Sequence, residues 1–196
     1  LTVAEQHHAW ATRLCLQVAR GMLHLHGKGI LHRDLKSQNV WINQSDVAKV
    51  GDFGMSRINS HKTMTMVGSP LWCAPEILKS EQYSFGADVY SFSIIVFEAL
   101  QWTEPYMHMT VIEIMIAVTQ QHERPEISPS VPDALRALIC ECWQPVAEMR
   151  PTFGSIVQRL EGCQHSQIPA ASPQKRQRQK QKQHAARHAE RVRNIE

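Results

Sequence analysis

Three short motifs in a fixed order constrain the fold of this chain more than any other feature of its sequence. They are HRDLKSQN at residues 32–39, Asp52-Phe53-Gly54, and Ala74-Pro75-Glu76. The first motif places a carboxylate beside a lysine and an asparagine, and the second places another carboxylate on a nearby turn. The fold must bring these two loops together, because such a set suits phosphoryl transfer from a metal-bound nucleotide.

The pattern of apolar and capping residues predicts a mainly α-helical fold. Thr2-Val3-Ala4-Glu5 is a capping-box pattern, so we expect a helix to begin almost at the first residue and to end near Gly27. Thr110 to Glu113 form a second capping box and predict another helix. Further helices are expected over residues 89–100, from Pro132 through Trp143, and over 152–160 before Gly162.

Short β-prone runs flank the first motif. They occupy residues 29–31, 40–42 and 48–50, and the turn-rich residues 43–46 separate the last two. From Asp52 to Glu76 the chain is polar and has no sustained period, which predicts a loop held by tertiary contacts. Long ordered loops are usually functional.

Composition favours one compact domain followed by a basic tail. Residues 174–196 hold eight Lys or Arg and two Glu, a balance of +6, so the remainder carries −3 of the formal net charge of +3. We expect a domain over residues 1–163 and a disordered, Gln-rich tail over 164–196. A nuclear-import signal, an RNA-binding arm and a site for anionic lipid are alternatives for this tail. No aromatic residue interrupts it, which argues against single-stranded nucleic acid.

The cysteines and the hydropathy pattern point to a cytoplasmic protein, with nuclear entry through the tail as an alternative. Five cysteines are an odd number in a domain of this size, so we expect reduced thiols and no disulfide framework. Cys140 and Cys142 should point to different helix faces, which argues against a zinc site. No apolar run is long enough to cross a bilayer, and the N-terminus has no signal-peptide pattern.

The motif series resembles the catalytic domain of the eukaryotic protein kinases. Its residues are most similar to those of the tyrosine-kinase-like group of serine/threonine kinases. The resemblance covers residues 1 to about 163 and is also carried by LQVARGMLHLH, GSPLWCAPE, DVYSFSII and CWQPVAEMRPTF. It implies the C-terminal lobe of the α+β kinase fold, mainly helical with a few short strands. It also implies ATP and Mg²⁺ as cofactors, Ser or Thr of a protein as acceptor, and a role in signal transduction.

The resemblance assigns a role to four residues of the motifs. Asp34 would be the catalytic base that accepts or orients the proton of the acceptor hydroxyl. Lys36 would place a positive charge at the transferring phosphoryl group, which suits serine/threonine specificity. Asn39 and Asp52 would be the Mg²⁺ ligands, because both offer hard oxygen atoms.

Other residues receive structural roles in the same interpretation. His32 and Phe53 would pack together and set the position of Asp52. Asp88 would cap the backbone of the catalytic loop. Glu76 would pair with Arg150, because either charge buried alone would be costly.

The loop between the second and third motifs carries the expected substrate and regulatory residues. Ser69 stands where serine/threonine kinases usually have Thr, near the substrate. Arg33 is a candidate phosphate reader, and phosphorylation of Ser60, Thr63 or Thr65 would let it order the loop. The alternative is that these three hydroxyl groups are simply exposed to solvent.

Two departures from the family pattern favour an alternative function, a truncated or pseudo-kinase lobe that binds other proteins without catalysis. First, the sequence contains no Gly-rich phosphate loop, strand lysine or helix glutamate and begins without Met at its first predicted helix, so we expect the N-terminal lobe to be absent. Second, Trp41 replaces the usual Leu under the adenine ring. It would either narrow the adenine pocket or repack into the core. Oligomeric state and substrate identity do not follow from the sequence.

Overall fold

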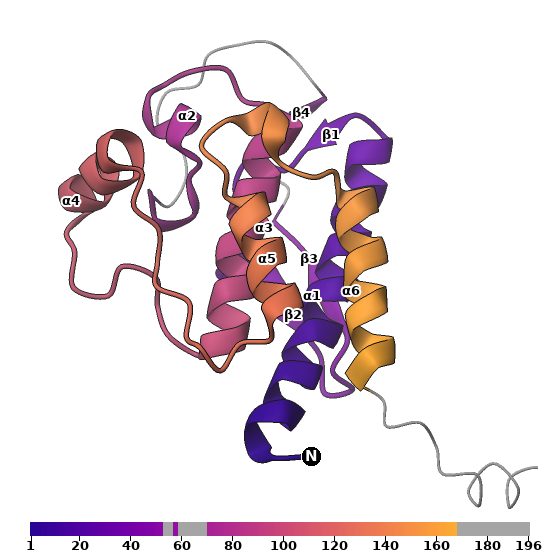
Figure 1. Cartoon of the computed structure of the whole chain (residues 1–196). Helices are drawn as coiled ribbons and strands as arrows, with labels where there is room; N and C mark the ends of the chain where they lie inside the picture. Colours follow the sequence, from indigo (N-terminus) through magenta and orange to yellow (C-terminus); the bar gives the residue numbers. More distant parts are fainter. Residues whose placement is uncertain (53–56, 59–69, 168–196) are drawn as a thin grey trace, which may run out of the picture. The chain divides into compact units, whose positions relative to one another are not determined.

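The computed structural model describes residues 1–52, 57–58 and 70–167 (Figure 1). Residues 1–164 form one compact unit, and residues 165–196 belong to a second. The hydrophobic core lies within the first unit.

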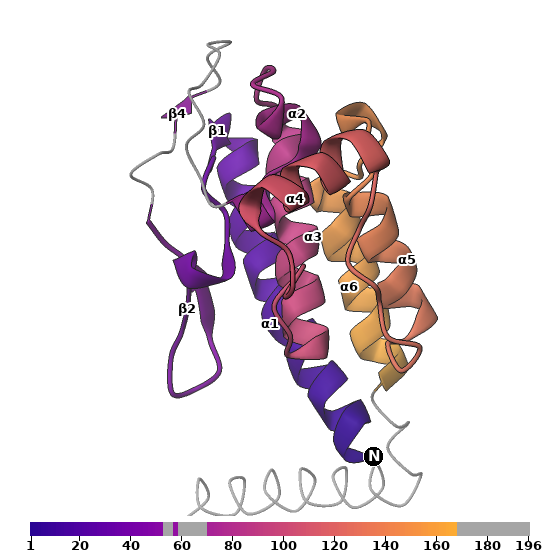
Figure 2. The same cartoon turned by 90° about the vertical axis from the view of Figure 1, so that its left-hand side faces the viewer.

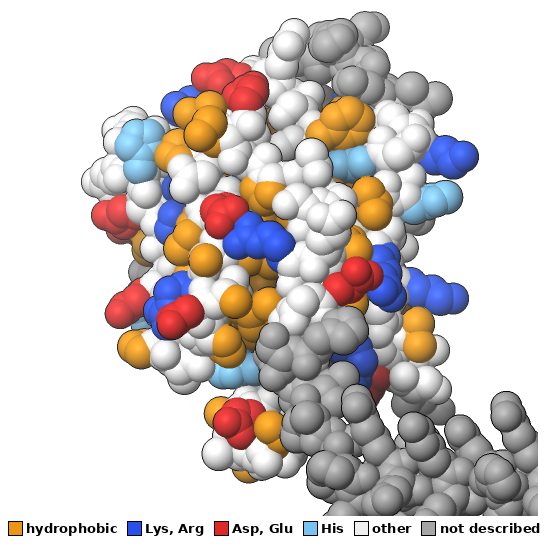
Figure 3. Space-filling model, turned by 45° about the vertical axis from the view of Figure 1, so that its right-hand side comes forward, with side chains coloured by type: hydrophobic (Ala, Val, Ile, Leu, Met, Phe, Trp, Pro, Cys, Tyr) orange, Lys and Arg blue, Asp and Glu red, His pale blue; other side chains and the backbone are white. Residues whose placement is uncertain are grey.

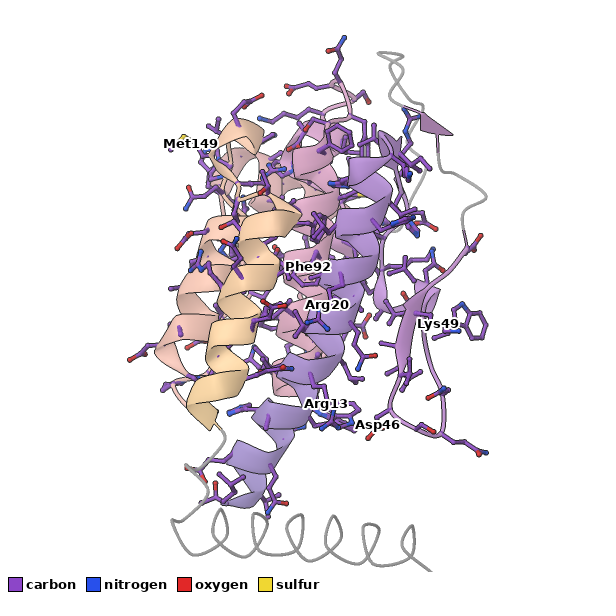
Figure 4. The ribbon with its side chains drawn as sticks, turned by 90° about the vertical axis from the view of Figure 1, so that its right-hand side faces the viewer. Arg13, Arg20, Asp46, Lys49, Phe92 and Met149 are labelled. Carbon is purple, nitrogen blue, oxygen red and sulfur yellow. The ribbon has the colours of Figure 1, made fainter. Side chains whose placement is uncertain are left out.

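Four long helices run alongside one another and enclose the core (Figures 1 and 2). The most buried is α3, which contacts both α1 and α5 and carries the fully buried Phe92 and Ile94. Figure 4 places Phe92 among the long helices. Apolar side chains from every turn of α3 therefore face other helices, as expected for a helix that is apolar all round. The four helices are α1 (Val3–Gly27), α3 (Phe85–Gln101), α5 (Asp133–Cys142) and α6 (Phe153–Gln167).

Shorter elements connect and flank the long helices. Helix α2 (Pro75–Leu78) follows a 3₁₀ turn at Pro70–Trp72. Helix α4 (Val111–Ile116) continues into a π-helical turn at Ala117–Gln121. Further 3₁₀ turns lie at Ser37–Asn39 and Ala147–Met149.

Two small antiparallel sheets lie around the first motif. Strand β1 (Ile30–Leu31) pairs with β4 (Arg57–Ile58), and β2 (Val40–Ile42) pairs with β3 (Ala48–Val50). In the second sheet Val40 faces Val50 and Ile42 faces Ala48. This β2–β3 hairpin packs against α1 through β3 (Figure 2).

Polar contacts attach the turn of the β2–β3 hairpin to α1. The side chain of Gln17 accepts a hydrogen bond from Ala48 N–H at 2.7 Å and donates one to the carbonyl of Asp46 at 3.2 Å. Arg13 forms an ion pair with Asp46 at 3.3 Å (Figure 4). These contacts fix where the strands lie relative to α1, and so where the loop that precedes β2 lies.

The two predicted capping boxes and the predicted strands are confirmed. In both capping boxes the threonine hydroxyl accepts a hydrogen bond from the backbone N–H of the glutamate. The glutamate carboxylate in turn accepts one from the backbone N–H of the threonine. The pairs are Thr2 with Glu5 and Thr110 with Glu113. The hydrogen bonds from Thr110 lower the pKa of Glu113. Strands β1, β2 and β3 lie within the three predicted β-prone runs. The local pattern was sufficient here because each cap involves residues only three positions apart.

Two predicted helix boundaries are wrong. Helix α3 begins at Phe85, four residues before the predicted start, because the buried Asp88 interrupts the apolar pattern inside its first turn. Helix α6 passes through Gly162 to Gln167, into the segment predicted as tail. Core contacts of Leu160 and Cys163 on either side of Gly162 offset its poor helix propensity. The segment 52–76 also contains β4, the turn Pro70–Trp72 and the start of α2.

Two glycines should respond to alanine in opposite directions. A Cβ at Gly86 would lie 2.7 Å from the carbonyl oxygen of Ala147, whereas nothing lies within 4 Å of a Cβ at Gly162. We expect Gly86→Ala to destabilise the fold by about 1–3 kcal/mol through overpacking. Gly162→Ala should stabilise it by about 0.5–1 kcal/mol, because alanine is the better helix former. Urea unfolding followed by circular dichroism measures both; equal changes would contradict the close approach at Gly86.

All five cysteines are free thiols. Burial raises the pKa of Cys15 to about 12 and that of Cys73 to about 11.

In the ranges 1–52, 57–58 and 70–167 no helix is both long and apolar enough to span a membrane. The face in Figure 3 shows acidic and basic side chains interspersed with small apolar patches. Pairs such as Arg20 with Glu161 and Arg159 with Glu141 link α6 to α1 and α5.

Candidate active site

The first motif folds into a compact loop between β1 and β2, with Asp34 at its centre. Lys36 Nζ lies 2.8 Å from Asp34 Oδ2. Asn39 Nδ2 donates to the same oxygen at 3.1 Å and to the backbone carbonyl of Asp34 at 2.7 Å. The Asp34 carboxylate is only slightly exposed, so a cation and an amide donor hold it in one orientation.

Asp88 holds the start of this loop from inside the protein. Its Oδ2 accepts the His32 backbone N–H at 2.9 Å, and its Oδ1 accepts the Arg33 N–H at 3.1 Å. The side chains of His26 and Tyr83 also lie within hydrogen-bond distance, at 2.9 and 2.8 Å. The predicted capping role of Asp88 is therefore confirmed. Burial and the adjacent Asp88 charge raise the pKa of Tyr83, which keeps its hydroxyl a donor.

This cap supports an unusual backbone conformation at Arg33. Arg33 has a φ of 70°, in the left-handed region that non-glycine residues rarely adopt. Its side chain is buried and its guanidinium lies 5.8 Å from the ring centroid of Tyr83. The bonds to Asp88 compensate for the strain at this position, which directs the chain toward Asp34.

His32 joins the loop to the second motif. Its Nδ1 faces the Asp34 N–H at 3.4 Å and its Nε2 lies 3.1 Å from the carbonyl of Gly51. Because Nδ1 accepts a hydrogen bond from the Asp34 N–H, Nε2 carries the proton and donates to the carbonyl of Gly51. Gly51 N–H in turn donates to the carbonyl of Asn39 at 2.8 Å. Two bonds thus hold the residue before Asp52 against the loop that carries Asp34 and Asn39.

Asn39 and Asp52 offer a donor set that fits Mg²⁺. With Nδ2 of Asn39 bound to Asp34, its Oδ1 remains as the atom that can face a cation. Asp52 is exposed, with a φ of 56°. Across the described ranges no three His, Cys, Asp or Glu side chains gather into a metal site. Two oxygen ligands suit a cation that completes its shell with phosphate and water.

The predicted pair of Glu76 and Arg150 is confirmed and lies at one end of α3. Arg150 Nη1 and Nη2 donate to the two carboxylate oxygens at 2.7 and 2.8 Å. The guanidinium is fully buried and also donates to the carbonyls of Gly86, Gln144 and Pro145. This pair attaches the third motif to the α5–α6 connection.

Trp41 does not repack into the core, so that alternative is wrong. Trp41 is 68% exposed on β2. The indole instead covers Gly51, because a Cβ there would lie 2.7 Å from Trp41 Cδ1 and Nε1. Trp41 therefore lies over the residue that precedes Asp52, and narrowing of an adenine pocket stays a prediction.

Sequence reasoning missed one group of interactions beside the catalytic loop. Glu98 of α3 accepts hydrogen bonds from Ser37 and from the indole of Trp72. The available signal was a single acidic residue inside the apolar run 89–100, which in a buried helix requires partners. The contact of Tyr83 with Asp88 was also missed, and the sequence around Tyr83 gave no comparable signal.

Several predicted residues lie outside the described part of the chain. They are Phe53, which was predicted to pack on His32, the substrate residue Ser69, and the regulatory positions Ser60, Thr63 and Thr65. The roles of these residues stay predictions.

The family model for protein tyrosine and serine/threonine kinases matches residues 3–160. The chain is 41% identical over 155 residues to the probable serine/threonine-protein kinase drkC of Dictyostelium discoideum, which covers 76% of the chain and 21% of that protein. It is 36% identical to the probable serine/threonine-protein kinase drkA of the same organism, over 79% of the chain and 24% of that protein. It is 39% identical to the serine/threonine/tyrosine-protein kinase HT1 of Arabidopsis thaliana, over 76% of the chain and 39% of that protein.

Proposed function

This chain belongs to the protein tyrosine and serine/threonine kinase family, and from that premise we propose that it carries the catalytic loop of a serine/threonine kinase. The proposed reaction is transfer of the γ-phosphoryl group of ATP to a Ser or Thr hydroxyl of a protein. The chain spans 21%, 24% and 39% of the lengths of the three relatives named above, so the activity of the whole protein is part of this proposal.

The observation that carries the proposal is the convergence of Lys36 and Asn39 on the Asp34 carboxylate. An acceptor hydroxyl that hydrogen-bonds to Asp34 would be aligned for attack and could pass its proton to the carboxylate. Lys36, held at 2.8 Å from Asp34, would then lie beside the transferring phosphoryl group and balance its charge. One geometry thus serves both the nucleophile and the phosphoryl group.

Asn39 and Asp52 would hold Mg²⁺, which when bound neutralises phosphate charge and orients the triphosphate. The residues of this chain supply the positioning. Asp34 fixes the amide of Asn39, and the His32–Gly51 bond places Asp52 beside the loop. Lys36 would contact the phosphate oxygens.

Replacing Asp34 with asparagine is the direct test of the proposed reaction. We expect Asp34→Asn to lower phosphate transfer by about 10²–10⁴-fold, because the amide cannot accept the proton of the acceptor hydroxyl. The measurement is transfer of labelled phosphate from ATP to a generic basic protein, with and without Mg²⁺, using the 196-residue chain. Asp133→Asn is the matched control. It replaces a fully exposed carboxylate on α5 and should retain activity.

The same assay separates catalysis from the alternative function. Mg²⁺-dependent transfer that Asp34→Asn abolishes supports the kinase. Absence of both ATP binding and transfer would contradict catalysis by this chain and favour a non-catalytic protein-binding lobe. Equal transfer by the wild-type chain and Asp34→Asn would contradict the role of Asp34.

Further parts of the proposal concern the surroundings of this site. Ser69 would contact the acceptor, and Arg33 would read phosphate on Ser60, Thr63 or Thr65. The proposal includes a cytoplasmic location, with nuclear entry through the basic tail as the alternative, and a role in signal transduction, which the resemblance implies. Nucleic acid is not a proposed partner.

A further inference from the structure

A pocket of about 510 Å³ lies at the end of the domain where Glu76 pairs with Arg150. Two segments far apart in the sequence form its walls: residues 81–85, which lead into α3, and residues 145–148, between α5 and α6. Figure 1 shows both connections at the same end of the long helices, near α2. None of the described residues that line this pocket belongs to the catalytic loop. The proposed phosphate transfer therefore does not explain it.

Hydrogen bonds hold the two walls of the pocket together. Arg150 donates to both carboxylate oxygens of Glu76 and to the carbonyls of Gly86 and Pro145. The backbone N–H of Glu81 donates to the Glu76 carbonyl at 2.8 Å. The pocket is thus already formed in the chain alone, and a ligand would not need to order its walls on binding.

Two carboxylates in the pocket have no cation beside them. Arg150 neutralises Glu76, whereas Glu81 and Glu148 are exposed and form no ion pair within residues 1–52, 57–58 and 70–167. The described lining residues include no Lys, Arg or His. A concave surface lined by charge of one sign concentrates its field on a ligand. The pocket therefore favours a positively charged group.

Ser84 adds a hydroxyl group that the fold does not use. It is the N-cap residue of α3, where a serine side chain usually accepts a backbone N–H, but it makes no capping bond. Its Oγ is buried and has no hydrogen-bond partner among the described residues, and Ser84 lines the pocket. A buried oxygen without a partner costs free energy. A hydrogen-bond donor on the ligand would remove this cost.

The other lining residues show which kind of cation fits. Phe85, Pro145 and Val146 give the pocket an apolar wall beside its carboxylates. Across the described ranges no three His, Cys, Asp or Glu side chains could hold a metal ion. An arginine side chain combines an apolar stem, which packs on such a wall, with a planar guanidinium that carries five N–H donors. Its weak hydration also makes it easier to bury than an ammonium group.

We propose that this pocket binds a basic segment of a partner protein and takes up an arginine side chain of that segment. The guanidinium would pair with Glu81 and Glu148 and donate to Ser84 Oγ, while the arginine stem packs on Phe85 and Val146. Charge complementarity selects a basic partner over an acidic one. This binding does not require phosphate transfer, so the two proposals can fail separately.

Nuclear magnetic resonance of the ¹⁵N-labelled 196-residue chain tests the pocket directly. The probe is an acetylated hexapeptide with two central arginines flanked by glycines. We expect it to shift the backbone resonances of residues 81–85 and 146–148 in a saturable way. A hexapeptide with citrulline, which keeps the shape of arginine without its charge, should leave them in place. Absence of saturable shifts in these segments, or equal shifts with citrulline, would overturn the proposal.

Three variants test the residues that would contact the arginine. Glu81→Gln and Glu148→Gln should each weaken binding of the hexapeptide about two- to fivefold, the range for an exposed ion pair, whereas Asp133→Asn outside the pocket should not change it. Ser84→Ala should weaken binding without lowering the urea midpoint of unfolding, because the hydroxyl has no partner in the fold. Unchanged binding in the double variant of both glutamates would overturn the proposal. A lower midpoint in Ser84→Ala would overturn the role of its hydroxyl group.

Two further measurements distinguish a basic segment from other occupants. Agmatine presents a single guanidinium without a peptide, and binding as tight as that of the hexapeptide would assign the pocket to a small amine instead. Dilution of the chain alone should leave the resonances of residues 81–85 and 146–148 unchanged. Shifts on dilution would assign the pocket to a second copy of the chain and overturn the separate partner.

Discussion

Asp88→Asn is expected to lower the free energy of unfolding by about 3–5 kcal/mol, the range for breaking a buried, fully paired charge. Asp88 is completely buried, and its two oxygens face donors on four residues: His26, His32, Arg33 and Tyr83. An asparagine can accept on one side only, and its NH₂ group would face donors on the other. Donors without an acceptor inside the protein would then cause most of the loss.

The effect of Asp88→Asn should also reach the catalytic loop. The bonds from His32 and Arg33 to Asp88 stabilise the left-handed conformation of Arg33, one residue before Asp34. Without these bonds we expect the Arg33 backbone to relax and Asp34 to lose its fixed orientation. This change should occur even where the Asp88→Asn variant is still folded, below the urea concentrations that unfold it.

Urea unfolding monitored by far-ultraviolet circular dichroism measures the stability change, with Asp133→Asn as the matched control. Asp133 is fully exposed in the first turn of α5, so its replacement should change stability by less than about 0.5 kcal/mol. A change of less than about 1 kcal/mol in Asp88→Asn would show that Asp88 does not hold the loop.

Arg150→Met should destabilise the protein by a similar amount, about 3–5 kcal/mol. Methionine keeps much of the buried side-chain volume but removes every donor. The Glu76 carboxylate would lose a bidentate partner, and the carbonyls of Gly86, Gln144 and Pro145 would each lose a hydrogen bond. The lost packing of the guanidinium on Tyr90, at 5.3 Å, adds to the effect.

Arg159→Met is the matched control, because it removes the same chemical group from an exposed pair. Arg159 and Glu141 are one-third and one-half exposed, so the loss should be about 1 kcal/mol or less. A double-mutant cycle of Arg150→Met with Glu76→Gln then isolates the coupling of the buried pair. Equal losses in Arg150→Met and Arg159→Met would contradict the importance of burial for this pair.

Two kinds of sequence information contributed to the predicted structure. The capping boxes at Thr2 and Thr110 were predictable because donor and acceptor are three residues apart. The pairing of Glu76 with Arg150 came from the family resemblance, since 74 residues separate the partners. The ends of α3 and α6 were missed because packing around Asp88 and beyond Gly162 outweighed the local pattern.

The sequence by itself determined the order of the motifs, the helix caps, the short strands and the chemistry available at Asp34, Lys36, Asn39 and Asp52. Only the tertiary structure brought His26 to Asp88, from 62 residues away, and joined Ser37 and Trp72 through Glu98. The physical reason is the range of the interactions. Caps and strand periods are set within a few residues, whereas the partners of a buried carboxylate depend on which helices and loops pack together.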